Sequence, residues 1–355
     1  MNTKVAEAIQ PPSSDAPAAG SAGKVTPQRE TTHRTSGWLL FGERYGLVFV
    51  LVFVIALFSM IDSSTFPTVS NWRSIGSTQS VTVVLGLAFI LPLVGGNFDL
   101  SVGANAIMCS VACAACMSRY GWPLAAAIAL SVGLGLVVGV FNGILVTRAR
   151  LNGLIATIGT AALLQGVVTW YSSGVPIASG ISQTLQNVGT KTTFGVPRLV
   201  WVAVVAASIV TYVLTQTPYG RRLASIGSNR NAARLVGVRV NALTMGSFVL
   251  AGGIAGLAGV LIVAQQGSAN PATDGIATLL PALTVAFLGA SAFSPGEFNV
   301  PGLVVALLLI AVLVSGLTLG GAADWVQPLC NGVALIVGVG LSAYFRARRL
   351  GGAEV

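Results

Sequence analysis

Ten long apolar runs constrain this chain more than any other feature of its sequence. They lie at residues 45–61, 75–94, 101–118, 122–146, 154–171, 199–215, 242–264, 276–292, 301–319 and 326–344. A helix of about 20 apolar residues crosses about 30 Å of hydrocarbon. In lipid, only helices and closed barrels satisfy every backbone polar group. The sequence therefore predicts an all-α polytopic membrane protein with about ten transmembrane helices.

Composition and local pattern divide the chain into three parts. It is 54% hydrophobic and 8% charged, against about 25% charged residues in soluble domains, so lipid must solvate much of its surface. Residues 1–40 are rich in Ala, Ser, Thr and Pro without periodicity, which predicts a disordered cytoplasmic tail. We expect a transmembrane domain at 41–347, with a cytoplasmic loop at 216–241, and a cytoplasmic tail at 348–355. The eighth run is the weakest because Pro281 interrupts it.

The basic residues predict which loops face the cytoplasm. When the N-terminus is placed in the cytoplasm and the runs alternate sides, fifteen of the 19 Lys and Arg residues fall on the cytoplasmic side. The other four are Arg73, Arg119, Lys191 and Arg198. Cytoplasmic loops of membrane proteins carry an excess of Lys and Arg. The asymmetry therefore supports ten spans and places both termini in the cytoplasm.

The longest predicted cytoplasmic loop concentrates arginine. Residues 217–240 read TPYGRRLASIGSNRNAARLVGVRV, with five arginines and no acid. One interpretation is that these charges only anchor the loop in the cytoplasm. The alternative is that Ala232 and Ala233, lying among the arginines, present a small exposed face that docks into a groove on another protein.

Local signals predict how this loop folds. We expect a loop ending at Gly227, followed by a short helix over "NAARLV". Ser228 or Asn229 can cap the start of that helix, because their side-chain oxygens accept from free N–H groups. Gly237 can end it, because glycine readily adopts the left-handed conformation that closes many helices.

A second polar motif, "GGNFDLS", separates the second and third runs. Gly95 and Gly96 can break the helix there, and Asp99 and Ser101 can cap the helix that follows. Broken helices in membrane bundles often line a substrate path. Two interpretations stay open: these four residues line a translocation pathway, or Asp99 is only an N-cap at the membrane boundary.

The motifs of common enzyme sites are missing from the sequence. It contains no GxxxxGK[ST] phosphate loop, no GxSxG and no HExxH, so we expect no catalytic residues and no ATP hydrolysis by this chain. We also expect no cofactor and no metal, since Cys109, Cys113 and Cys116 share one helical face without a nearby His or acid and so favour packing. The basic residues lie in short loops rather than on one soluble face, which argues against binding nucleic acid.

Small residues recur every four positions in two of the apolar runs. Close helix packing within one subunit is the favoured meaning, and a dimer interface is the alternative. The residues are Gly135, Gly139 and Gly143 in the fourth run, and Ala251, Gly252, Ala255, Gly256 and Gly259 in the seventh.

Several of these segments together resemble the bacterial ribose-type sugar permeases. "GGNFDLSVGA" is similar to their GG-x-DLSVG segment, and "TPYGRRLASIGSNRNAARLVGV" to their large cytoplasmic loop. "LAGGIAGLAGVLIVAQQGSANP" and "NGVALIVGVGLSAYFRARR" resemble the segments that follow. The resemblance covers about residues 42–347. The sequence departs from the family at "LLPALTVAFLGASAFSPGEFNVPG", where Ala and Ser stand at positions that are commonly glycine.

The resemblance implies the permease subunit of an ATP-binding cassette importer in the bacterial inner membrane. Two permease copies, expected here as a homodimer, would carry a monosaccharide or related polyol by alternating access. A cytoplasmic ATP-binding cassette subunit and a periplasmic sugar-binding protein would be the partners, with membrane lipid around them. The motif match assigns contact with the ATPase to Gly227, Asn229, Ala232, Ala233 and Gly237.

The alternation of sides also predicts inverted repeats of helices 2–5 and 7–10, because the first set starts outside and the second inside. The alternative function is an ion-coupled secondary transporter of a small polar solute. Such a transporter needs a titratable group within the membrane, for which Asp99 is the candidate.

Overall fold

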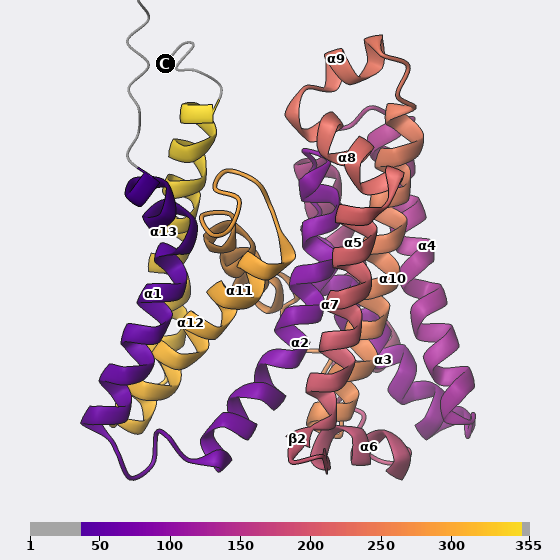
Figure 1. The fold of residues 1–355 in the computed structure, drawn as a ribbon. Coiled ribbons are helices and arrows are strands. Elements are labelled where there is room, and N and C mark those ends of the chain that lie inside the picture. The colour runs from indigo at the N-terminus through magenta and orange to yellow at the C-terminus, as the bar shows by residue number, and fades with distance from the viewer. Residues whose placement is uncertain (1–36, 350–355) are drawn as a thin grey trace, which may run out of the picture. The chain divides into compact units, whose positions relative to one another are not determined.

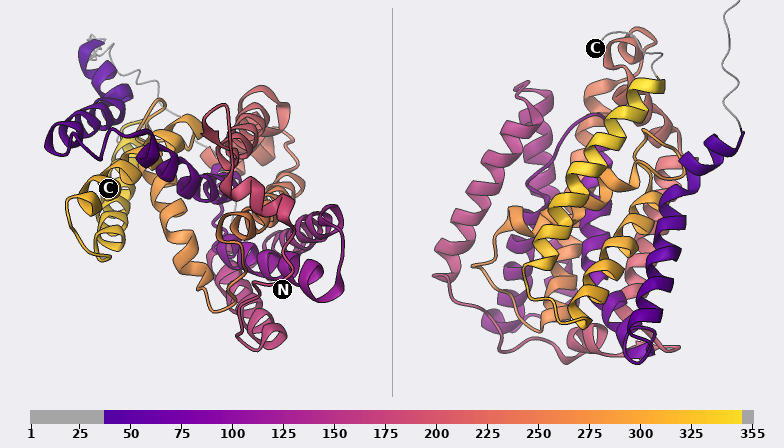
Figure 2. Two further views of the ribbon diagram at one scale, coloured as in Figure 1. Left: turned by 90° about the horizontal axis from the view of Figure 1, so that it is seen from below. Right: turned by 90° about the vertical axis from the view of Figure 1, so that its left-hand side faces the viewer.

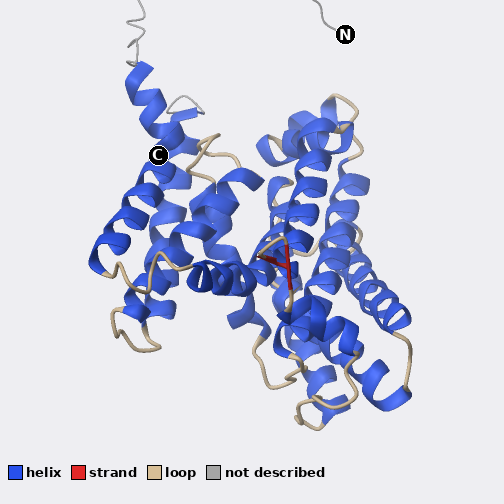
Figure 3. Ribbon diagram, turned by 60° about the horizontal axis from the view of Figure 1, so that its bottom comes forward, coloured by secondary structure: helices blue, strands red, loops and turns tan. Residues whose placement is uncertain are grey.

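The computed structural model describes residues 37–349, with side chains described for residues 44–345. Helices account for most of this range, and strands occur in it only as one pair of two-residue strands (Figure 3). In chain order the elements are α1 (Gly37–Ile61), α2 (Val69–Val94), α3 (Val102–Tyr120), α4 (Leu124–Thr147), α5 (Gly153–Ser172), α6 (Gln183–Thr190), β1 (Thr192–Thr193), β2 (Val196–Pro197), α7 (Arg198–Gln216), α8 (Pro218–Ser228), α9 (Arg230–Leu235), α10 (Val240–Gln266), α11 (Gly275–Gly289), α12 (Val300–Leu319) and α13 (Val326–Arg349). The predicted tails at 1–40 and 348–355 lie outside the described residues, except that 37–40 begin α1 and 348–349 end α13.

The predicted all-α membrane fold is confirmed. Nine helices within residues 37–349 are long and apolar enough to cross a membrane, namely α1 to α5, α7, α10, α12 and α13. The eighth predicted span corresponds to α11, which has 15 residues and ends at Gly289 rather than at residue 292. At 1.5 Å per residue it is about 22 Å long, short of the roughly 30 Å of hydrocarbon. Pro281 lies inside α11, as the weak eighth run predicted.

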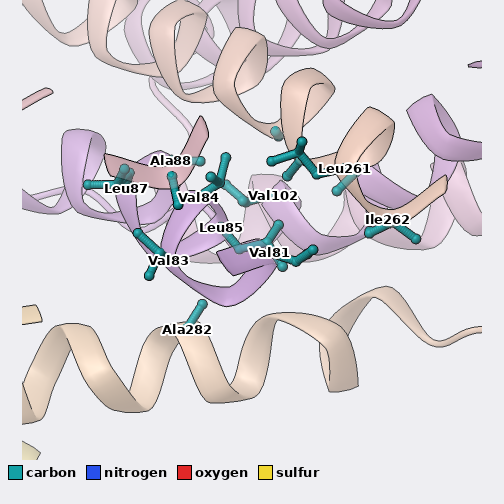
Figure 4. Packing of buried hydrophobic residues seen from close by; sticks show 14 of the residues in the cluster. Val81, Val83, Val84, Leu85, Leu87, Ala88, Val102, Leu261, Ile262 and Ala282 are labelled. Atoms are coloured by element: carbon teal, nitrogen blue, oxygen red, sulfur yellow. The ribbon is translucent and has the colours of Figure 1, made fainter. Parts of the chain in front are cut away.

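Helices α2 and α10 form the centre of the packing. α10 packs against α4, α3 and α2, and α2 packs in addition against α7, α11 and α12. Figure 4 shows Val84, Leu85 and neighbouring α2 side chains beside Leu261 and Ile262 of α10, with Ala282 of α11 on the opposite side. Leu87 and Ala88 are completely buried. Residues 83–94 of α2 and 248–264 of α10 are uninterrupted apolar sequence, which permits burial of these segments on all sides.

The recurring small residues bring α4 and α10 into close contact. A Cβ built on Gly135 would lie 2.3 Å from the Gly252 carbonyl oxygen, and one on Gly252 would lie 2.2 Å from the Gly135 oxygen. A Cβ on Gly139 would lie 2.4 Å from the Phe248 oxygen. Since any side chain here would collide with backbone, the glycines permit packing within one subunit, which confirms the favoured interpretation of their spacing.

A second set of contacts joins the first helix to the last three. α1 packs on α12, and α11 packs on both α12 and α13, with α1, α12 and α13 running beside one another (Figure 2). α11 also contacts α2 and α3, so it connects this set to the central helices. The predicted inverted repeat stays a prediction.

The segments between the long helices gather at two opposite ends (Figure 1). α8 and α9 lie at one end, and α6 and β2 lie at the other. Arg73, at the start of α2, donates from Nε to the Gly195 carbonyl oxygen at 2.8 Å and therefore lies with the β hairpin. This separation agrees with the alternation of sides that the basic residues predict.

Candidate functional site

The loop between α7 and α10 is folded into two short helices. Pro218 occupies the first turn of α8, where its missing N–H costs nothing, and the Thr217 side chain accepts from the Gly220 N–H. α9 begins at the cap Asn229, whose Oδ1 accepts from the Asn231 N–H at 3.1 Å and the Ala232 N–H at 2.9 Å. The choice that the sequence left open between two caps is therefore decided in favour of Asn229.

The expectation of a loop ending at Gly227 is wrong, because residues 218–228 form α8. The physical reason is a buried stripe: Gly220, Leu223 and Ile226 recur every three residues and pack against the helical bundle. α9 ends at Leu235, and Gly237 adopts φ +81° two residues later, as its predicted closing role requires.

The two alanines of α9 face in different directions. Ala233 is 4% exposed and packs with Ile226 and Val240, whereas Ala232 is exposed. Of the two alanines expected on the small face, only Ala232 is therefore exposed. Leu235 is 88% exposed and Val236 79% exposed, so α9 presents apolar side chains to its surroundings that the expectation did not include.

The two polar motifs found in the sequence contact each other. A Cβ built on Gly227 of α8 would lie 2.0 Å from the Val94 carbonyl oxygen at the end of α2. A Cβ on Gly95 would lie 2.8 Å from Leu223 Cδ1. Gly96 adopts φ +74° and faces the Gly227 backbone. α8 therefore lies directly on the Gly95–Gly96 turn, so that a displacement of α8 would move the end of α2.

Asp99 lies at the centre of a buried polar network next to this turn. Its side chain is 2% exposed, and Oδ1 accepts from the Ser101 N–H at 3.0 Å and the Ser101 hydroxyl at 2.6 Å. Burial raises the pKa of the Asp99 carboxyl to about 6, while the hydrogen bonds from Ser101 and Asn142 lower it. Ser101 is the N-cap residue of α3 but makes no side-chain capping bond.

Three polar residues that the sequence analysis missed complete the network. Asn142 of α4 donates to Ser101 Oγ at 2.7 Å, and the Thr160 hydroxyl donates to Asn142 Oδ1 at 2.7 Å. The Leu100 N–H donates to Thr157 Oγ1 at 3.0 Å. Their signal was present in the sequence, because Asn142, Thr157 and Thr160 are polar residues within mainly apolar runs. The network fastens the Asp99 turn to α4 and α5.

A cavity of about 1030 Å³ opens beside α9 and the Gly96 turn. Four arginines line it, and none of its described lining residues is acidic. Gly96 borders this cavity, whereas Asp99 and Ser101 do not. The accumulated positive charge suits an acidic surface on a partner. The four are Arg150 after α4, Arg230 and Arg234 of α9, and Arg239 before α10.

The described residues contain no group of three His, Cys, Asp or Glu side chains arranged to hold a metal ion. Cys109, Cys113 and Cys116 are instead buried in the packing of α3.

Comparison with known proteins finds similarity to transport permeases over most of the chain. A model of the family described as branched-chain amino acid transport system permease component matches residues 74–339. The ribose import permease protein of Escherichia coli strain K12 is 30% identical over 308 residues, covering 86% of this chain and 94% of that protein. The D-allose transport system permease protein of the same organism is 30% identical over 302 residues, covering 85% and 92%. The autoinducer 2 import system permease protein of Yersinia pseudotuberculosis is 28% identical over 281 residues, covering 79% of each. No solved structure matches this chain.

Proposed function

This chain belongs to the family of branched-chain amino acid transport system permease components, and from that premise we propose that it is the permease subunit of an ATP-binding cassette importer for a monosaccharide. The observation that supports a sugar as the transported solute is the extent of the similarity. Relatives named for ribose and D-allose import are each 30% identical over at least 85% of this chain. Similarity over nearly the whole membrane domain supports a shared solute class as well as a shared fold.

The chain supplies the pathway, and a separate cytoplasmic ATPase supplies the energy. The sequence has no phosphate loop, so ATP hydrolysis falls to another subunit. The exposed side of α9, with Ala232 and Leu235, and the following residue Val236 offer a surface for that subunit. The arginine-lined cavity beside α9 complements an acidic surface on the same partner.

Contact between α8 and α2 offers a route from the ATPase to the pathway. Of the five residues assigned to ATPase coupling, Ala232 is available for direct contact. Gly227 and Ala233 act within the chain, holding α8 on α2 and α9 on α10. Asn229 caps the start of α9, and Gly237 closes the chain after its end. A force on α9 would therefore pass through α8 to the end of α2.

The remaining parts of the proposal follow from charge and from the relatives. The fifteen-to-four asymmetry of Lys and Arg supports both termini in the cytoplasm of a bacterial inner membrane. A periplasmic binding protein would deliver the sugar to the end that carries α6 and the β hairpin. Two copies of the permease would enclose the pathway as a homodimer.

Reconstitution tests the proposal against ion-coupled transport. Asp99 is the candidate titratable group for that alternative, because it is the one buried acid among the described side chains. The permease is placed in proteoliposomes with an ATP-binding cassette ATPase and a sugar-binding protein from the same organism, and uptake of labelled D-ribose, D-allose, D-xylose and D-galactose is measured. We expect uptake of at least one sugar to require ATP on the ATPase side and to persist when ionophores collapse proton and sodium gradients. Uptake by the permease alone on an imposed ion gradient would refute the proposal.

A further inference from the structure

A second cavity, of about 300 Å³, lies between α2, α11, α12 and α13. Its apolar wall includes Val285, Leu307 and Ile310. Amide and hydroxyl side chains line the rest, and none of its described lining residues is ionisable. We call it the amide–hydroxyl cavity. A cluster of neutral polar groups within membrane helices is costly against lipid, so these side chains call for a polar occupant.

Six of its side chains make no hydrogen bond to the part of the chain that the structure describes. They are Ser74, Thr78, Gln79, Thr82, Gln327 and Asn331. Asn331 is the most informative, since it is 4% exposed and its amide has no hydrogen-bond partner among the described residues. The Asn331 amide is not among the fully buried side-chain atoms without a partner in the described residues, and the cavity that Asn331 lines is the space open to it. The Asn331 amide is therefore placed to bond something that enters the cavity.

The cavity is deep and its mouth is held in shape. Ser74 and Thr78 are exposed near the start of α2, whereas Thr82, one turn further along the helix, is less exposed. At the mouth, the Ser315 hydroxyl of α12 donates to Asn71 Oδ1 of α2 at 2.9 Å, which joins the two helices. These residues belong to the end that the basic residues predict to face outward, so the cavity opens toward an arriving solute.

Pro281 contributes to the cavity from α11. It lies inside the helix and lines the cavity, and having no N–H it cannot donate to the carbonyl of Ala277 one turn earlier. Proline is tolerated inside membrane helices where other groups satisfy the freed carbonyl. It also stands in the segment where this sequence departs from the ribose-type permeases, which makes the cavity a place where solute preference can differ.

We propose that the amide–hydroxyl cavity is a sugar-contact site on the import pathway, selective for a neutral polyhydroxylated solute of monosaccharide size. Asn, Gln, Ser and Thr side chains both donate and accept, which matches hydroxyl groups that do the same. The volume is at the lower end of the range for small-molecule sites, about 300–1,000 Å³. An amino acid would bring an ammonium and a carboxylate into a cavity without counter-charges, which is unfavourable. This inference rests on the proposed function.

Two cavity variants and one matched control test the site in the reconstituted importer. Thr82→Val keeps the size of the side chain and removes its hydroxyl, and Asn331→Leu removes the buried amide. The control Thr211→Val removes a hydroxyl that bonds only the Ala207 carbonyl of its own helix, away from the cavity. At sugar concentrations below saturation we expect uptake to fall about tenfold in each cavity variant, as for one lost hydrogen bond, and to stay at the wild-type rate in the control. Excess leucine should not compete.

A labelling measurement keeps the test independent of how well the variants fold and transport. Gln79→Cys is made together with Cys330→Ser and treated from outside with a membrane-impermeant thiol reagent. We expect labelling, slowed severalfold by the transported sugar and unaffected by leucine. Equal uptake by wild type, Thr82→Val and Asn331→Leu, or labelling that the transported sugar does not slow, would overturn the sugar-contact site while leaving the importer function standing. Failure of the wild type to import any sugar in the panel would overturn both.

Discussion

Replacing Gly227 with alanine tests whether α8 must lie directly on the end of α2. The new Cβ would lie 2.0 Å from the Val94 carbonyl oxygen and 3.3 Å from the Gly96 nitrogen. Both are backbone atoms, so no side chain can rotate out of the way. α8 would have to move by about 1.5 Å to restore ordinary contact distances of about 3.5 Å.

Two effects of opposite sign decide the magnitude. Alanine in place of glycine stabilises a helix by about 1 kcal/mol, and overpacking costs about 1–3 kcal/mol. A clash with rigid backbone at this distance belongs at the upper end of that range. The net cost to the α8–α2 contact is then about 2 kcal/mol, which lowers the equilibrium constant for forming the contact roughly thirtyfold.

The assay is uptake and ATP hydrolysis by the reconstituted importer. We expect Gly227→Ala to retain the ATPase, because the exposed surface of α9 is unchanged, while uptake per ATP hydrolysed falls severalfold. Gly166→Ala in α5 is the matched control, since nothing lies within 4 Å of its added Cβ. If Gly227→Ala transports as well as Gly166→Ala, the α8–α2 contact does not carry the coupling.

Three further outcomes are expected. Ala232→Glu should leave thermal stability unchanged but weaken the affinity for the ATPase, measured by co-purification, by about 2 kcal/mol or roughly thirtyfold. Ala233→Glu should instead lower thermal stability because its position is buried. The reverse pattern would contradict the orientation of α9. Arg230→Cys and Lys191→Cys should react with impermeant thiol reagents from opposite sides of the membrane. If both react from the same side, the ten-span topology is rejected. Asp99→Asn should keep ATP-driven uptake. Because burial raises the Asp99 pKa from 3.8 to about 6, the stability of the wild type should fall as pH rises through that interval. Thermal melts of the variant should lack this dependence on pH.

Much of the fold could be predicted because its determinants are local. Run length against bilayer thickness identified every long helix, and the four-residue spacing of small residues predicted close packing within one subunit, which the structure places between α4 and α10. The end of the eighth span was misplaced by three residues, since apolar sequence continues beyond Gly289 although the helix does not. The polar character of the stretch that begins at residue 217 excludes a membrane helix and favours a loop ending at Gly227. In the folded chain, α8 is held by burial of Leu223 and Ile226, and its glycines permit close approach to neighbouring backbone.

The candidate site divides in the same way. Asn229 as a cap and Gly237 as a closing residue follow from the chemistry of their own side chains. That Ala232 faces outward and Ala233 inward could not be predicted, since neighbouring positions of a six-residue helix differ only by what lies beside them. Asp99 could be recognised as exceptional, but its partners Asn142 and Thr160 lie on other helices and become neighbours only through packing.

The sequence by itself determined that this chain is a bundle of membrane helices, which ends of those helices carry the positive charge, and which family it joins, because hydrophobicity, charge and motif act along the chain. Only the tertiary structure decided that Gly227 lies on Val94 and that Thr82 and Asn331 line one cavity. These pairs are far apart in sequence, and whether two such residues meet depends on how the helices cross and rotate. That geometry is set by close packing of all the side chains together.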